Sequence, residues 1–179
     1  MNMRKIVVIL DNIRSRENVG SIFRTADAVG VAKIYLCGIT PIPKLDNSEL
    51  RISDSKINSQ FAIHNKIIDK ISKTALGAEK WVPWEYHKQT WRLIEKLKKD
   101  GYQIIALEKT KTAKNLFEVE AQNGPVALMV GNEVLGLSPE ILKRSSRVVS
   151  IPMNGQKESL NVAVAFGIAV YHFSTIIER

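Results

Sequence analysis

The stretch from Ser150 to Phe173 (SIPMNGQKESLNVAVAFGIAVYHF) constrains the fold more than any other part of the chain. Residues 147–151 are a β-branched run that predicts a short strand, and residues 153–158 form a polar loop with a glycine. Ser159 then predicts a helix N-cap, because its hydroxyl can accept a hydrogen bond from a first-turn amide. The following helix is apolar on nearly every side, which predicts a buried element. Small ligands bind in open α/β sheets where a strand leads into such a loop and helix.

Two further stretches have the same character. Residues 126–130 (VALMV) predict a buried strand, and the polar loop Gly131-Asn132-Glu133 follows directly. Near the start of the chain, Asn18 precedes a predicted helix over residues 19–29, which we expect it to cap. We therefore expect three polar segments, each beside a buried element, as candidates for a binding site.

The order of the predicted elements indicates the fold class. Buried strands are expected at residues 5–10, 33–37, 103–107, 126–130 and 147–151, alternating with helices at 19–29, 90–99 and 138–144. Such alternation predicts one α/β domain over residues 1–179, with a mostly parallel sheet and helices on both faces. An edge strand is expected at residues 81–84, because Pro83 cannot donate to a central ladder. The helix at 90–99 is expected to turn Trp91, Ile94 and Leu97 inward.

Composition narrows the class of protein. The formal net charge is +8 and the pI is about 9.6, which favours nucleic acid as a partner over an unrelated basic surface. Cys37 is the one cysteine, so no intramolecular disulfide can form, and a cytoplasmic protein is expected. No stretch reaches the roughly 18 apolar residues that a spanning helix needs, and no signal peptide is visible, so no membrane association is expected.

The sequence lacks the motifs of several common binding and catalytic sites, which argues against those sites here. No GxG occurs, which argues against an ordinary dinucleotide fold, and GxSxG is absent too. Gly131 and Gly136 have the spacing of a phosphate-binding loop, but Leu137-Ser138 stands where Lys-Ser/Thr is required. The three histidines have no metal-binding spacing, so no metal is expected.

Three segments, NVGSIFRTADAVG, VGNEVLGLS and IPMNGQKESLNVAVAFG, occur in this order along the chain. Together they resemble the three motifs of the SpoU/TrmH family of S-adenosylmethionine-dependent RNA ribose methyltransferases. The resemblance covers almost the whole chain; residues 45–72 do not match, and an insertion is expected there, either an arm near the substrate or a surface loop. It implies a C-terminal deep trefoil knot, and a homodimer with each active site near the subunit interface.

The resemblance also implies a set of binding residues for the methyl donor, S-adenosylmethionine. Gly131, Ile151 and Leu160 are expected to line the donor pocket, and Leu107 to meet the adenine. From the residues alone, core packing is the better interpretation of Ile151 and Leu160.

A second implied set, Arg24, Asn18, Glu133, Ser159 and Asn161, is expected to act on the acceptor. Arg24 either activates the ribose hydroxyl with help from an RNA phosphate, or clamps that phosphate and stabilises the developing alkoxide. Glu133 is expected to orient Asn18 or Arg24. Ser159 and Asn161 are expected to hold arginine side chains or the acceptor nucleotide. On helix spacing alone, Arg24 is a surface residue paired with Asp27.

The predicted function is therefore methyl transfer from S-adenosylmethionine to a ribose 2′-hydroxyl of RNA. A tRNA substrate is favoured over rRNA, because the chain has no room for the separate N-terminal RNA-binding domain of some ribosomal members of the family. Two alternatives remain open at this point. One is a non-catalytic RNA-binding protein with a degenerate pocket, and the other is a knotted methyltransferase that acts on a base; Asn18, Arg24 and Ser159-Leu160-Asn161 favour the ribose.

Overall fold

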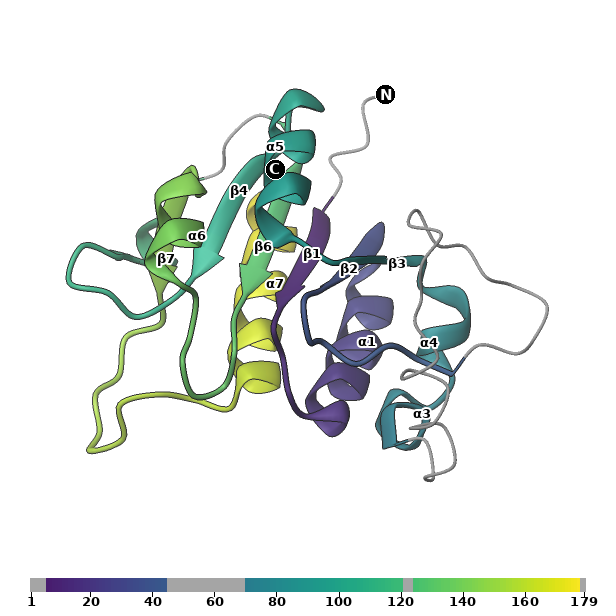
Figure 1. Ribbon diagram of the computed structural model, residues 1–179. Helices are drawn as coiled ribbons and strands as arrows, with labels where there is room; N and C mark the ends of the chain where they lie inside the picture. The colour runs from purple at the N-terminus through teal and green to yellow at the C-terminus, as the bar shows by residue number, and fades with distance from the viewer. Residues whose placement is uncertain (1–5, 45–69, 121–123, 178–179) are drawn as a thin grey trace.

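A computed structural model describes residues 6–44, 70–120 and 124–177 of the chain. Within these ranges, seven strands form one sheet in the order β3-β2-β1-β6-β4-β7-β5, and every neighbouring pair is parallel (Figure 1). The strands are β1 (Ile6–Asp11), β2 (Lys33–Cys37), β3 (Trp84–His87), β4 (Gln103–Leu107), β5 (Lys114–Asn115), β6 (Val126–Val130) and β7 (Arg147–Ser150). The predicted parallel sheet is confirmed.

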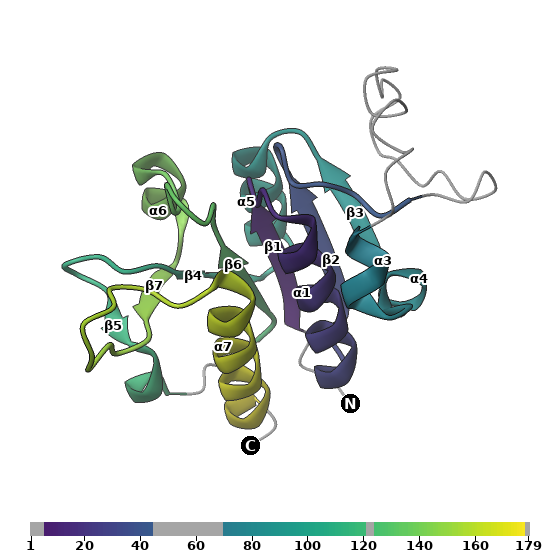
Figure 2. The ribbon, with the colours of Figure 1, turned by 90° about the horizontal axis from the view of Figure 1, so that it is seen from below.

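Helices cover both faces of this sheet (Figures 1 and 2). They are α1 (Arg16–Val29), α3 (Lys70–Ala75), α4 (Ala78–Trp81), α5 (Thr90–Lys99), α6 (Pro139–Arg144) and α7 (Val162–Ile177), with a 3₁₀ turn η2 at Leu116–Glu118. Because side chains alternate along a strand, Val8 and Leu10 of β1 pack in one buried cluster with α1, α3 and α7. Val7 and Ile9 pack in a second cluster with α5 and α6. The fold is thus a three-layer α/β/α arrangement, as predicted.

The two helices nearest the site begin at residues other than those predicted. Ser15, not Asn18, caps α1: its hydroxyl accepts a hydrogen bond from the Asn18 amide at 3.1 Å. Likewise Ser159 is not a cap, because α7 begins at Val162 and the Asn161 side chain accepts from the Ala163 amide at 2.8 Å. In both segments a second capping residue lies within three positions, and sequence alone does not decide between them.

The prediction that α7 is a buried element holds for only one side of the helix in the single chain. Phe166 and Phe173 are buried against α1 and the sheet, but Val164 and Tyr171 are 52% and 50% exposed. One side of the helix therefore faces solvent in spite of its apolar sequence.

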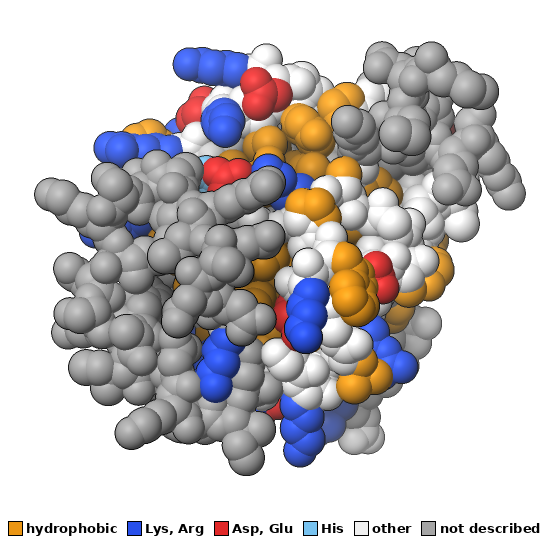
Figure 3. Space-filling view, turned by 90° about the vertical axis from the view of Figure 1, so that its right-hand side faces the viewer, with side chains coloured by type: hydrophobic (Ala, Val, Ile, Leu, Met, Phe, Trp, Pro, Cys, Tyr) orange, Lys and Arg blue, Asp and Glu red, His pale blue; other side chains and the backbone are white. Residues whose placement is uncertain are grey.

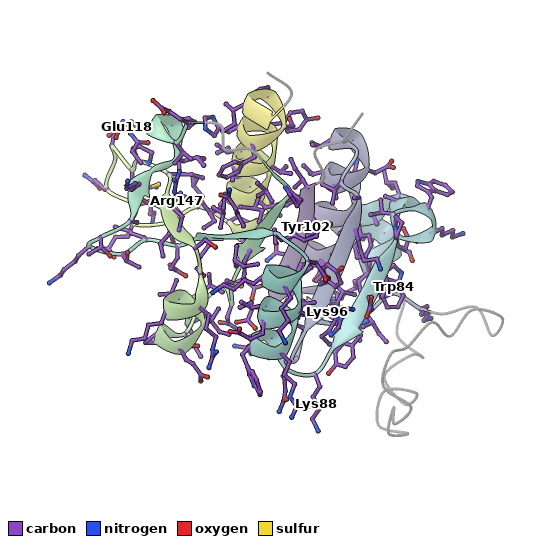
Figure 4. All side chains as sticks on the ribbon, turned by 90° about the horizontal axis from the view of Figure 1, so that it is seen from above. Trp84, Lys88, Lys96, Tyr102, Glu118 and Arg147 are labelled. Carbon is purple, nitrogen blue, oxygen red and sulfur yellow. The ribbon has the colours of Figure 1, made fainter. Side chains whose placement is uncertain are left out.

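Two further predictions, one on the edge strand and one on α5, also need correction. The edge strand is β3, residues 84–87, and not 81–84, because Trp81 ends α4 and Pro83 precedes the strand. Leu93 replaces Trp91 in the core face of α5, where Trp91 is 37% exposed and stacks beside Arg92 and Arg144. The outer face of α5 is basic: Lys96, and Lys88 just before the helix, lie on the side of the sheet away from α7 (Figure 4).

The predicted insertion at residues 45–72 lies almost entirely outside the described residues. On the side of the molecule where the described chain resumes, near β3, α3 and α4, basic and apolar side chains are interspersed (Figure 3). Helix α3 is fixed on α1 there: Lys70 pairs with Glu17 at 2.8 Å, and the Thr74 hydroxyl donates to the Glu17 carbonyl at 3.1 Å.

We expect Gly20→Ala to destabilise the protein, because Gly20 of α1 lies in close contact with α3. An added Cβ would overlap with Thr74 Oγ1 and with the main-chain oxygen of Ile71, and the latter cannot move unless α3 does. Overpacking of this kind costs about 1–3 kcal/mol, a fall of several degrees in the melting temperature. Thermal unfolding followed by circular dichroism measures it.

Gly167→Ala is the matched control, since a Cβ in the middle of α7 would meet only Thr25 Cγ2, at 3.8 Å. Alanine favours a helix by up to about 1 kcal/mol over glycine, so this variant should be as stable as the wild type or more so. Equal melting temperatures for the two variants would show that the contact between α1 and α3 does not limit stability.

Candidate active site

The carboxyl ends of β4, β6 and β7 surround a pocket of about 720 Å³. Loops that follow parallel strands meet at one edge of a sheet, and ligands bind there. Eight of the nine residues predicted from the sequence line this pocket: Asn18, Leu107, Gly131, Glu133, Ile151, Ser159, Leu160 and Asn161. The ninth, Arg24, does not. The structure therefore brings three segments far apart in sequence to one site.

A chain of hydrogen bonds joins the three segments. The Glu133 carboxylate accepts from the main-chain amides of Arg14 at 2.9 Å and Ser15 at 3.0 Å, and from the Asn18 side-chain amide at 2.9 Å. Asn18 Oδ1 in turn accepts from Asn161 Nδ2 at 3.0 Å. Because Asn161 also caps α7, its side chain is held at both ends. The amide of Asn18 thus has a fixed place beside the pocket.

These hydrogen bonds set the charge of Glu133. Burial raises its pKa, but the amide donors of Arg14, Ser15 and Asn18 lower it by more, so the pKa lies below the ordinary value for a glutamate. The side chain is therefore ionised at neutral pH, and both of its oxygens are already engaged. Such a carboxylate is suited to holding the loop before α1 in place and poorly suited to accepting a proton.

We expect Glu133→Gln to destabilise the protein in a pH-dependent way. Glutamine has one acceptor oxygen for three donors, and a lost hydrogen bond of this kind costs about 1–2 kcal/mol. Because the pKa of Glu133 is lowered in the folded state, its stabilisation is present above the unfolded-state pKa of about 4.3 and is lost as the pH falls through the folded-state value. The melting-temperature difference from the wild type should be constant between pH 7 and 5 and shrink below about pH 4.

Glu158→Gln provides the control, because Glu158 lines the same pocket and no hydrogen bond to its carboxylate is recorded among the described residues. This variant should match the wild type at every pH. A Glu133→Gln difference that persists unchanged in acid would contradict the role of the carboxylate charge.

On the β6 side of the pocket, the main chain at Gly131 lies very close to the main chain at Gly136 and Leu137. A Cβ on Gly131 would lie 2.8 Å from the carbonyl carbon of Gly136 and 2.8 Å from the amide nitrogen of Leu137. Gly136 itself has φ +65°, in the left-handed region that favours glycine. The loop from 131 to 137 folds back on itself only because both positions lack side chains.

Sequence reasoning missed three residues at this site. Asn132 is buried and donates to the Asn12 carbonyl at 2.8 Å, while its Oδ1 accepts from the amides of Val134 and Leu135. Glu108 accepts from the Leu137 amide at 2.8 Å. Arg14 lines the pocket beside Asn18. The only available sequence indication was the tendency of asparagine to bond to the backbone two residues on, as Asn132 does.

Arg24 lies on the exposed side of α1, outside the pocket of its own chain. It follows Asn18 by six residues, which is about 9 Å along the helix and on another face. The alternative pairing of Arg24 with Asp27 is also absent from the ion pairs of the described residues. One chain alone thus leaves this guanidinium facing solvent.

Neither a metal site nor a membrane span is found in the described parts of the chain. No three or more His, Cys, Asp or Glu side chains gather there in an arrangement that could hold a metal ion. None of the helices in these ranges is both long and apolar enough to cross a bilayer.

Comparison with known proteins identifies the family. A model of the SpoU rRNA Methylase family matches residues 5–68 and 59–171. A tRNA (guanosine(18)-2′-O)-methyltransferase of Aquifex aeolicus is 32% identical over 94% of this chain and 68% of its own length. The protein of the same name from Escherichia coli (strain K12) is 27% identical over 93% of this chain and 61% of its own length. The chain thus spans about two thirds of the length of these relatives.

The solved structures agree with the sequence comparison. The A. aeolicus TrmH/SpoU tRNA modifying enzyme superposes with a TM-score of 0.72 at 31% identity, over 98% of this chain and 77% of that one. An S-adenosylmethionine-bound rRNA methyltransferase from Sinorhizobium meliloti superposes with a TM-score of 0.74 at 25% identity, over 96% and 56%. The resemblance drawn from three short motifs is confirmed, and this chain belongs to the SpoU rRNA methylase family.

Proposed function

We propose that this chain transfers a methyl group from S-adenosylmethionine to a ribose 2′-hydroxyl of RNA, with tRNA as the preferred substrate. The observation that carries the proposal is the meeting of three motif segments at one pocket, joined by the hydrogen bonds of Asn18, Glu133 and Asn161. The substrate class rests on relatives named as tRNA 2′-O-methyltransferases. A tRNA substrate implies action in the cytoplasm.

The pocket has the size and lining that S-adenosylmethionine requires. Its volume of about 720 Å³ lies within the usual range for small-molecule sites. Leu107, Ile151 and Leu160 offer an apolar wall for the adenine, and Gly131 lets the ligand approach main-chain amides and carbonyls. When bound, this donor supplies an electrophilic methyl group on a sulfonium. The chain's own part is to hold it, orient it and exclude water.

The amides of Asn18 and Asn161 and the hydroxyl of Ser159 form the acceptor side of the site. Hydrogen bonds to Glu133, to the Ala163 amide and between the two side chains hold both amides in place. These groups therefore need not change position when the acceptor ribose binds. We assign Glu133 the role of holding Asn18. Arg24 is assigned to an RNA phosphate close to the reacting hydroxyl, where its charge stabilises the oxyanion as the hydroxyl loses its proton.

We further propose that the active form is a homodimer and that the segment from Ile151 to Asn161 completes a trefoil knot. Support for the dimer comes from apolar side chains left exposed beside the pocket, namely Val134, Leu135, Leu160 and Val164. Support for the knot comes from the family and from the path of the chain: β7 lies beyond β4 in the sheet, yet α7 returns to pack on α1.

The test begins with donor binding and then compares substrates. S-adenosylmethionine should raise the melting temperature, as a ligand specific to the native state must. The chain should then transfer label from the donor to unmodified tRNA and leave unmodified rRNA unlabelled. No thermal shift and no label in either RNA would support a non-catalytic RNA-binding protein instead. Label in rRNA alone would support the proposed reaction but show that the substrate is rRNA and not tRNA.

A further inference from the structure

Arg14 is the arginine that lines the pocket within one chain. It follows β1 and immediately precedes Ser15, the cap of α1. Among the described residues that line the pocket, Arg14 and Lys109 are the only cationic side chains. Lys109 Nζ donates to the Glu158 carbonyl at 3.3 Å on the opposite wall, whereas no hydrogen bond or ion pair is recorded for the Arg14 guanidinium in the described parts of the chain.

The main chain at Arg14 is held firmly although its side chain is exposed. Glu133 accepts from the amides of Arg14 and Ser15, and the same carboxylate holds the Asn18 side chain. The base of the Arg14 side chain is therefore fixed relative to Asn18.

The carboxylates of Glu133, Glu17 and Glu108 are each engaged elsewhere, and Glu158, which also lines the pocket, forms no ion pair with Arg14 among the described residues. Glu133 is occupied by three N–H donors. Glu17 pairs with Lys70 at 2.8 Å. Glu108 accepts from the main-chain amides of Leu137 and Lys109. A free cation beside the acceptor amides is thus available for an anion of the substrate.

RNA chemistry says which anion that is. In RNA the 2′-hydroxyl is on C2′, and the neighbouring carbon, C3′, carries a phosphate through its 3′ oxygen. Any internal ribose presented to Asn18 therefore brings this 3′ phosphate with it. A guanidinium presents paired N–H donors in a fixed planar fork that matches two phosphate oxygens, whereas a lysine ammonium acts as a point charge. From these observations, and resting on the proposed function, we infer that Arg14 binds the phosphate 3′ to the acceptor ribose within its own chain, separately from Arg24.

The experiment measures RNA affinity and does not depend on methyl transfer. An unmodified tRNA transcript is titrated into the protein with S-adenosylhomocysteine present, at several salt concentrations. Loss of one phosphate contact should weaken binding about tenfold in Arg14→Ala and reduce the salt slope by about 0.7–0.9. Arg14→Lys should retain the slope and recover part of the affinity, because the charge remains and the bidentate contact does not.

Arg16→Ala is the matched control: it removes the same charge two residues away, from a side chain that does not line the pocket. It should bind within about twofold of the wild type with an unchanged slope. S-adenosylmethionine affinity and melting temperature should be unchanged in Arg14→Ala.

Four results would overturn the assignment. They are wild-type RNA affinity and slope in Arg14→Ala, equal losses in Arg14→Ala and Arg16→Ala, a loss of donor affinity in Arg14→Ala, and no RNA binding by the wild type. If the affinity and slope fall as expected but the wild type transfers no methyl group, the phosphate site stands and the proposed reaction fails.

Discussion

Gly131→Ala is expected to remove S-adenosylmethionine binding while leaving the chain folded. The added Cβ would lie 2.8 Å from main-chain atoms of Gly136 and Leu137, so the loop must open to admit it. Opening displaces main-chain amides and carbonyls on the wall of the proposed donor pocket. Donor affinity should fall at least about a hundredfold, or about 2.8 kcal/mol, with a comparable fall in methyl transfer. Isothermal titration calorimetry measures the first and a label-transfer assay the second.

Gly155→Ala is the control for that variant. Gly155 lies in the loop between β7 and α7, and a Cβ added there would meet no heavy atom within 4 Å. Donor affinity should stay within about twofold of the wild type. Near-wild-type affinity in Gly131→Ala, with the melting temperature unchanged, would mean that the donor binds elsewhere.

Arg24→Ala is expected to abolish methyl transfer and to leave donor binding intact. Removing one charged group that stabilises a developing oxyanion costs about 10²–10³ in rate. Donor affinity should not change, because Arg24 is outside the pocket of its own chain. Single-turnover transfer with saturating donor measures the effect. Unaltered transfer would remove Arg24 from the catalytic set.

The exposed position of Arg24 makes a sharper test possible if the active form is a dimer. Mixed dimers of Arg24→Ala and Gly131→Ala chains would contain one site with an intact pocket and an arginine supplied by the partner. If Arg24 acts in the partner's pocket, mixing two inactive variants should restore about a quarter of wild-type activity. No restoration would place Arg24 in the site of its own chain, and a monomer in sedimentation analysis would contradict the dimer itself.

The sequence predicted well which segments meet at one pocket, because strand order and motif position carry that information. Buried strands such as Val126–Val130 are continuous apolar runs, and a polar loop at the end of each marks the edge of the sheet where ligands bind. Eight predicted residues therefore converge, including Ile151 and Leu160, for which core packing was the better interpretation without the family resemblance.

The predictions that failed depended on contacts between distant segments. Ser15 and Asn18, like Ser159 and Asn161, are all able to cap a helix, and the Glu133 carboxylate is what recruits Asn18 to the pocket instead. Asn132 and Glu108 hold loops through side-chain to main-chain hydrogen bonds, which leave no periodic pattern in a sequence. The exposed side of α7 was missed for a related reason. An apolar sequence predicts that a helix is buried, but it does not say whether the same chain or another molecule buries it.

The central claim is that this pocket methylates a ribose hydroxyl, and the identity of the product nucleoside tests it most directly. Wild-type protein, labelled S-adenosylmethionine and an unmodified tRNA transcript are incubated together, and the RNA is digested to nucleosides for mass spectrometry. The account predicts that the label sits on the ribose of a 2′-O-methylnucleoside, and that Gly131→Ala and Arg24→Ala form it at least about a hundredfold more slowly. A label on the base would contradict the account and indicate a base methyltransferase built on the same fold.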